Sequence, residues 1–113
     1  MILLPEVVVL ERGQDHLNLR LVLPESNLYF EGHFPGCPLL PGVVQIGWAI
    51  EFARLHIPFE ARFLALSAVK FMRMIQPDES VTLHLAADME RRELAFEYQL
   101  SGVPCSSGRV LFH

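Results

Sequence analysis

Hydrophobic and polar residues alternate along several short stretches of the chain, a pattern typical of strands with one buried face. From His16 to Leu23, every second residue is leucine and the positions between are mostly polar. Glu93 to Gly102 carries large apolar residues at alternate positions in the same way. Val7 to Leu10 is an apolar, mostly β-branched run, and residues 13–15 break it before the leucine-rich stretch. Val7 to Leu10 and His16 to Leu23 are therefore predicted to form a hairpin.

The middle of the chain changes to a helical pattern from Pro41 to about Leu55. Proline suits the first turn of a helix, because its missing N–H leaves no bond unmade there. Apolar residues occupy most sides of this segment, which predicts a buried helix rather than one at the surface. Pro58 ends it. Three more strands are expected, from Phe63 to Met74, Val81 to Met89 and Gly108 to His113.

The predicted order is thus two strands, one long helix and four further strands. A single sheet that curls around one apolar helix is the simplest packing for this order. We therefore expect an α+β fold, with an antiparallel sheet wrapped around the central helix and residues 1–113 forming one domain.

The composition and net charge of the chain argue against several classes of function. Hydrophobic residues make up 51% of the 113 residues, more than a small monomer easily buries, so we expect self-association as a dimer. The net charge of −4 argues against nucleic acid as a partner. No apolar run approaches the roughly 18 residues of a membrane span, and the N-terminus lacks a signal-peptide pattern. Cys37 and Cys105 have no metal or redox spacing, so we expect reduced thiols, a cytoplasmic location, and no metal or cofactor.

The segment from Gly32 to Gly42 is the one stretch that composition does not explain. It holds three glycines, three prolines and His33 within eleven residues, directly before the helix. Proline and glycine leave few backbone states here, so the imidazole of His33 is delivered to a helix N-terminus by a stiff loop. Such an arrangement favours a catalytic role for His33. The alternative interpretation is that His33 only hydrogen-bonds within the turn and stabilises it.

The motif G-H-F-P-G-x-P-x-x-P-G-V-x-Q-I at residues 32–46 resembles the signature of hot-dog-fold β-hydroxyacyl-(acyl carrier protein) dehydratases. A second stretch, V-K-F-x-R-x-I-x-P-D-E at residues 69–79, is similar to the same family's strand. The resemblance runs from about Leu17 to the C-terminus. It implies a dimer with sites at its interface and a substrate bound as a thioester of acyl carrier protein or CoA. It also implies that His33 is the catalytic histidine and that the Gly42 N–H polarises the thioester carbonyl.

The sequence departs from that family at one important position. The active enzymes carry a carboxylate on the helix five residues after the glycine that matches Gly42, and this chain has Gly47 there. Glu51 lies one turn later on the same helical face, so it is the candidate to replace the missing acid. The alternative for Glu51 is an ordinary ion pair with Arg54, three residues on.

Three functions follow from these residues. The first is dehydration of a 3-hydroxyacyl thioester to the trans-2-enoyl product, with resemblance to the aryl-polyene type of enzyme. The second is a non-catalytic acyl-binding subunit that pairs with an active dehydratase, because Gly47 replaces the acid. The third, thioester hydrolysis, has little support, because Glu51 is the only carboxylate on the helix. Trp48 and Phe52 are candidates for an acyl tunnel or for plain core. Lys70, Arg73, Arg91 and Arg92 either dock an acidic carrier or are scattered surface charges.

Overall fold

The computed structural model describes residues 4–23, 40–57, 62–76 and 80–113. These residues form six strands and one helix. The elements are β1 (Glu6–Arg12), β2 (His16–Val22), α1 (Gly42–His56), β3 (Phe63–Phe71), β4 (Val81–Asp88), β5 (Glu93–Leu100) and β6 (Val103–Phe112). The predicted order of two strands, one helix and four strands is confirmed.

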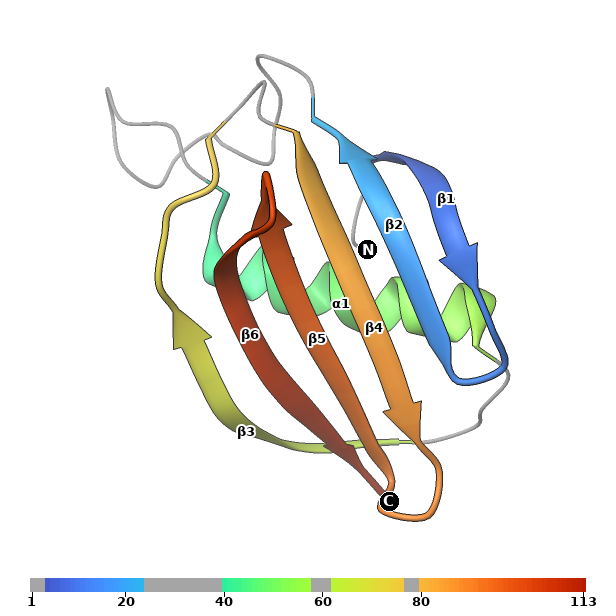
Figure 1. The fold of residues 1–113 in the computed structure, drawn as a ribbon. Helices are drawn as coiled ribbons and strands as arrows, with labels where there is room; N and C mark the ends of the chain where they lie inside the picture. The colour runs from blue at the N-terminus through green and yellow to red at the C-terminus, as the bar shows by residue number, and fades with distance from the viewer. Residues whose placement is uncertain (1–3, 24–39, 58–61, 77–79) are drawn as a thin grey trace.

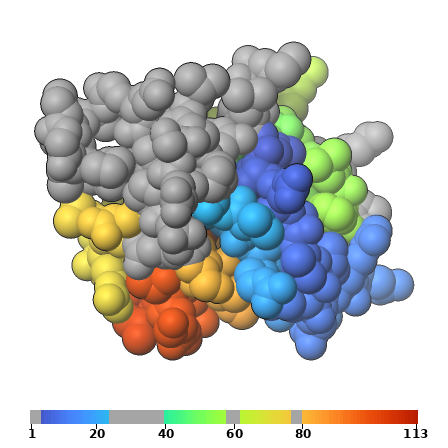
Figure 2. All heavy atoms as spheres, turned by 90° about the horizontal axis from the view of Figure 1, so that it is seen from above, coloured from blue at the N-terminus to red at the C-terminus, as the bar shows by residue number. Residues whose placement is uncertain are grey.

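All six strands belong to one sheet of order β1-β2-β4-β5-β6-β3, and every neighbouring pair is antiparallel. β1 and β3 are therefore the edge strands. The helix α1 runs across the back of the strands, and none of the described segments covers the front of the sheet (Figure 1). Seen from above, part of α1 is visible in green beside the blue β1 (Figure 2).

The core lies between α1 and the sheet, and alternation along the strands builds it. The leucines of β2 at positions 17, 19 and 21 are at most 2% exposed, as expected from their spacing. Trp48 and Phe52 from the helix are at most 3% exposed, so in the described chain they belong to this core rather than to a tunnel. Cys105 is a buried thiol in the same cluster.

The prediction of a buried helix is confirmed for the face of α1 on the sheet, but two apolar residues near its ends are exposed in the single chain. One face packs on the sheet, but Val43 is 73% exposed and Leu55 is 63% exposed. The physical reason is that one sheet covers only one side of a helix.

The last strand is longer than predicted, because β6 starts at Val103 rather than at Gly108. Two neighbours satisfy its backbone: β5 pairs with it along one side and β3 along the other. The sequence pattern alone does not predict this pairing with two neighbouring strands. β3 in turn ends at Phe71, short of the predicted Met74. No helix among the described residues is long and apolar enough to cross a membrane.

Candidate active site

Within the described part of the chain, the N-terminal end of α1 has backbone donors without an acceptor. Pro41 is the cap residue, with extended backbone, and its carbonyl accepts from the N–H groups of Val44 and Gln45, both at 3.1 Å. Gly42 is the first residue of the helix, and within the described residues its N–H has no acceptor. Because peptide dipoles align along a helix, this end carries partial positive charge. The prediction that Gly42 presents an N–H at a helix start is consistent with this geometry.

Phe71, the last residue of β3, covers Gly42. A Cβ atom on Gly42 would lie 2.6 Å from Cζ of the Phe71 ring, closer than real Cβ contacts. Glycine at position 42 therefore lets the ring approach the helix backbone.

A small pocket of about 200 Å³ opens at this contact. Its lining comes from the helix start and from the chain at the end of β3, and is mostly apolar, with one cation. The residues are Leu40, Gly42, Gln45, Phe71, Met72, Arg73 and Met74. An apolar pocket beside the N–H groups of a helix start suits a substrate with a carbonyl oxygen next to a hydrocarbon chain.

Three buried polar side chains fix the first turn of α1 against the sheet. Ser106 on β6 donates its hydroxyl to Oε1 of Gln45 at 2.6 Å, and Nε2 of Gln45 donates to the Leu40 carbonyl at 3.0 Å. The hydroxyl of Tyr98 on β5 donates to the Gln45 carbonyl at 2.7 Å. Gln45 is 3% exposed and the other two side chains are fully buried. We call these three residues the Gln45 network; it ties the pocket wall to two central strands.

Burial raises the pKa of the Tyr98 phenol well above its usual value, because the phenolate would lose its water. Tyr98 is therefore a neutral donor across the ordinary pH range. It holds the helix backbone and does not supply a titratable acid near neutral pH.

The predicted site residues have different fates. His33 lies outside the described residues, so its role stays a prediction. Glu51 is on α1 nine residues after Gly42, about 13 Å along the axis. Its side chain is 37% exposed and forms the ion pair with Arg54 at 3.2 Å. That is the alternative considered from the sequence.

Several residues of the site were missed by the sequence analysis. Phe71 lies in the second motif, which was a usable signal, and Tyr98 was assigned only to the buried face of a strand. Ser106 had no signal at all, since its partner Gln45 is 61 residues away.

The four candidate docking cations do not form one patch around the pocket. Arg73 lines it. Lys70 is on β3, and Arg91 and Arg92 lie in the turn between β4 and β5. Of these three, none lines the pocket.

A six-stranded antiparallel sheet with one helix across it is the hot-dog fold. The structure of the dehydratase heterocomplex ApeI:P from Xenorhabdus doucetiae superposes with a TM-score of 0.84 at 30% identity. The match covers 95% of this chain and 97% of that one. Mouse thioesterase superfamily member 2 shares the fold, with a TM-score of 0.68 at 10% identity.

Sequence comparison narrows this class. Residues 9–109 match the family model described as ApeI-like, the ApeI dehydratase. The 3-hydroxyacyl-(acyl-carrier-protein) dehydratase FabZ of Chloroflexus aggregans is 32% identical, over 80% of this chain and 67% of that protein. FabZ of a Roseiflexus species is 30% identical, over 97% of this chain and 79% of the relative. The chain belongs to the ApeI-like dehydratase family, within the hot-dog fold.

Proposed function

We propose that this protein is a cytoplasmic dehydratase that removes water from a 3-hydroxyacyl thioester on a carrier protein and gives the trans-2-enoyl thioester. The observation that carries the proposal is the pocket at the start of α1, where the Gly42 N–H, which has no acceptor among the described residues, adjoins an apolar wall. Membership of a dehydratase family and the FabZ relatives support the same reaction.

The chemistry needs three groups. A base takes the α-proton, and the electron pair moves toward the carbonyl oxygen. A donor stabilises that oxygen while the bond from the β-carbon to the hydroxyl breaks. An acid protonates the hydroxyl, which leaves as water. The thioester itself is not hydrolysed, so its acyl–sulfur bond stays intact.

We assign the Gly42 N–H to the developing oxyanion, where one such donor is typically worth about 10²–10³ in rate. His33 is the proposed base, because an imidazole ordinarily titrates near pH 6.5 and is partly neutral at physiological pH. Glu51, or a water bound next to Gly47, is the proposed acid. The ion pair with Arg54 must open, or the carboxylate must act while paired, for Glu51 to do this.

The direct test incubates the purified protein with a 3-hydroxyacyl carrier protein and follows loss of one water by mass spectrometry. His33→Ala abolishes the reaction if His33 is the base, whereas His113→Ala, at the exposed C-terminus, leaves it unchanged. Full activity of His33→Ala would refute the mechanism. Release of free carrier thiol would indicate hydrolysis instead.

The acid is tested by two further variants. Glu51→Gln abolishes activity if Glu51 protonates the leaving hydroxyl. Arg54→Gln is the matched control, because it removes the same ion pair and keeps the carboxylate. Gly47→Glu raises activity if the helix has only lost its acid. Activity that survives Glu51→Gln and does not respond to Gly47→Glu assigns the proton to water.

We also propose that the working unit is a dimer in which a second hot-dog chain covers the β3 edge. β3 is the last strand of the sheet, and its residues Phe63, Leu64 and Leu66 are between 41% and 52% exposed. An exposed apolar edge strand invites pairing with another chain. Leu64→Lys should yield monomers by native mass spectrometry, and Glu6→Lys on the other edge strand is the control. A monomeric wild type would overturn the proposal.

A second candidate function is that of a non-catalytic subunit that pairs with an active dehydratase. Gly47 favours it, and the similar structure from Xenorhabdus doucetiae is that of a dehydratase heterocomplex. It predicts no turnover by the isolated chain and turnover, or a raised melting temperature, when a second hot-dog chain is co-expressed. Turnover by the homodimer alone would exclude it.

A further inference from the structure

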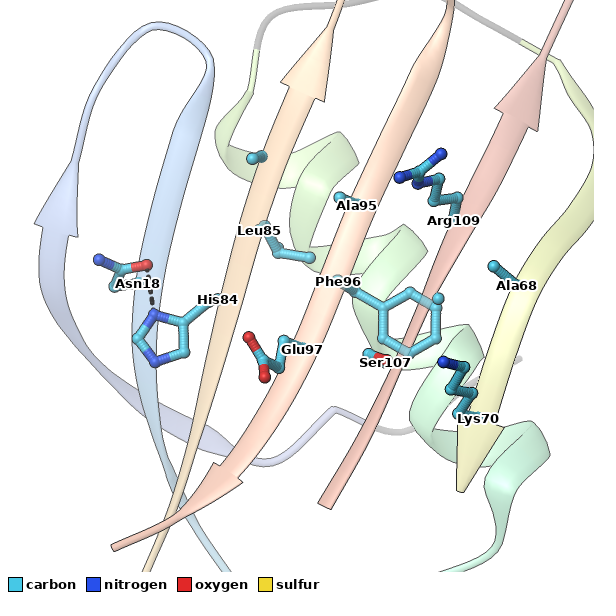
Figure 3. A pocket seen from close by; sticks show the side chains of 12 residues that line it. Asn18, Ala68, Lys70, His84, Leu85, Ala95, Phe96, Glu97, Ser107 and Arg109 are labelled. Atoms are coloured by element: carbon cyan, nitrogen blue, oxygen red, sulfur yellow. Dashed lines mark hydrogen bonds between the residues drawn. The ribbon is translucent and has the colours of Figure 1, made fainter. Parts of the chain in front are cut away.

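A separate hollow of about 480 Å³ lies on the face of the sheet away from α1 (Figure 3). Five strands contribute to it, and its lining differs from that of the pocket at the start of the helix, because most of it is polar or small. The lining residues are Asn18, Ala68, Lys70, His84, Leu85, Ala86, Ala95, Phe96, Glu97, Ser107, Gly108 and Arg109. Its volume lies within the range of small-molecule sites, roughly 300–1,000 Å³.

Strand register places the polar side chains of the hollow in one row. Asn18 pairs with His84, His84 with Glu97, Glu97 with Ser107, and Ser107 with Lys70. Directly paired residues on neighbouring antiparallel strands present their side chains to the same face. Five polar side chains therefore cross the sheet together.

The next row of paired residues on this face contains small alanine side chains, and the space above them is the hollow. Ala86 pairs with Ala95, and Ala95 pairs with Arg109. Next to them, the pairing of β3 with β6 is irregular between Ser67 and Lys70, and Ala68 there has a positive φ of 54°. A bulge of this kind redirects the strand and is often found beside functional sites. It brings Lys70 back into register opposite Ser107.

The positive and negative side chains of the hollow lie in different parts of it. Lys70 and Arg109 are exposed and form no ion pair within the described residues. Their charged ends turn toward the middle of the sheet (Figure 3). The carboxylate of Glu97 turns the other way, toward His84, and also lacks an ion-pair partner within that part of the chain.

His84 is already satisfied, in contrast to these three groups. Its Nδ1 lies 2.8 Å from Oδ1 of Asn18, so this nitrogen carries the proton and donates. Its Nε2 lies 3.4 Å from the hydroxyl of Thr82. The unused binding capacity of the hollow thus comes from two cations at one end and one carboxylate nearer the centre.

We propose that this hollow binds a small phosphate ester that also carries an amine. The phosphate carries about two negative charges at neutral pH as a monoester and one as a diester; it lies between Lys70 and Arg109 and accepts from the Ser107 hydroxyl. The amine donates to Glu97 over the alanine floor. An amino-alkyl phosphate, either free or as a lipid headgroup, has this chemistry.

The site is distinct from the pocket of the proposed dehydratase. Lys70 and Ser107 face the hollow. Their chain neighbours Phe71 and Ser106 pair with each other and contact α1 on the opposite face. The two sites therefore lie back to back across β3 and β6. Binding in the hollow does not depend on the proposed reaction.

The experiment titrates the purified protein with O-phosphoethanolamine and with ethyl phosphate, which lacks the amine, and follows backbone amide shifts by NMR. Saturable shifts at Ala95 and Gly108 are expected. Lys70→Gln and Arg109→Gln each weaken both ligands by about tenfold or more, since each removes a charge-assisted hydrogen bond. Arg20→Gln, which removes an exposed cation of β2 outside the hollow, changes neither affinity.

Two variants make the test sharp. Glu97→Gln weakens O-phosphoethanolamine but not ethyl phosphate, because only the first has an amine. Ala95→Ile fills the floor with a residue that favours strands, so it abolishes binding while the melting temperature is kept. Absence of saturable shifts in the wild type, or equal effects of Glu97→Gln on the two ligands, overturns the proposal. Vesicles that contain phosphatidylethanolamine distinguish the sources: binding that is lost in Lys70→Gln indicates a lipid headgroup, and binding of the free ester alone indicates a soluble ligand.

Discussion

Removal of the Ser106 hydroxyl is the most informative perturbation of the Gln45 network. Ser106→Ala deletes one oxygen from a fully buried position and leaves Oε1 of Gln45, otherwise bonded at 2.6 Å, without its donor. Gln45 is 3% exposed, so water cannot easily replace the serine. A buried acceptor left unsatisfied costs about 1–3 kcal/mol.

This cost translates into a clear change in melting temperature. The entropy of unfolding of a chain of this length makes 1 kcal/mol worth about 4 °C. Ser106→Ala should therefore melt about 4–12 °C below the wild type. Ser107→Ala, one residue along the same strand and on the other face, is the matched control and should change the melting temperature by less than about 2 °C.

The assay is thermal unfolding at one fixed protein concentration, because association shifts apparent stability. The double variant Ser106→Ala with Gln45→Leu should recover part of the loss, since removing both partners of a buried bond costs less than orphaning one. Equal melting temperatures of Ser106→Ala and Ser107→Ala would refute the inference that this bond anchors the start of α1.

Three further predictions concern the same region and the helix end. The free energy of unfolding should fall as pH rises above about 10, because Tyr98 ionises in the unfolded chain while burial keeps its pKa raised in the folded chain. Urea titrations of Tyr98→Phe should show a weaker fall at alkaline pH. An unchanged dependence of the unfolding free energy on pH would contradict the prediction. Gly42→Ala should lower dehydration by about 10²-fold by displacing the Phe71 ring, with partial recovery in the double variant with Phe71→Leu; turnover at the wild-type rate would show that the contact is unimportant. Burial, and then the charge of Arg12, lower the pKa of His56. The free energy of unfolding should therefore decrease as pH falls below about 6.5, because the unfolded histidine takes up a proton first. His56→Gln should flatten that decline, and an identical pH profile of the variant would argue against it.

The sequence by itself determined the elements and the buried faces of most strands. Alternation at positions 17, 19 and 21 predicted the leucines that form the core, and the helical spacing after Pro41 predicted α1. The position of Gly42 at the helix start also followed from sequence, because proline and glycine restrict the local backbone. These features depend on residues close in the chain, so a local pattern is enough to predict them.

Only the tertiary structure decided which distant residues meet. β3 joins the sheet beyond β6, at its edge, and β6 begins five residues earlier than its pattern suggests, because two neighbours complete its hydrogen bonds. The bond of Ser106 to Gln45 and the row from Asn18 to Lys70 exist only through strand register. Register depends on pairing across the whole sheet, and a one-residue shift would turn each of these side chains to the opposite face.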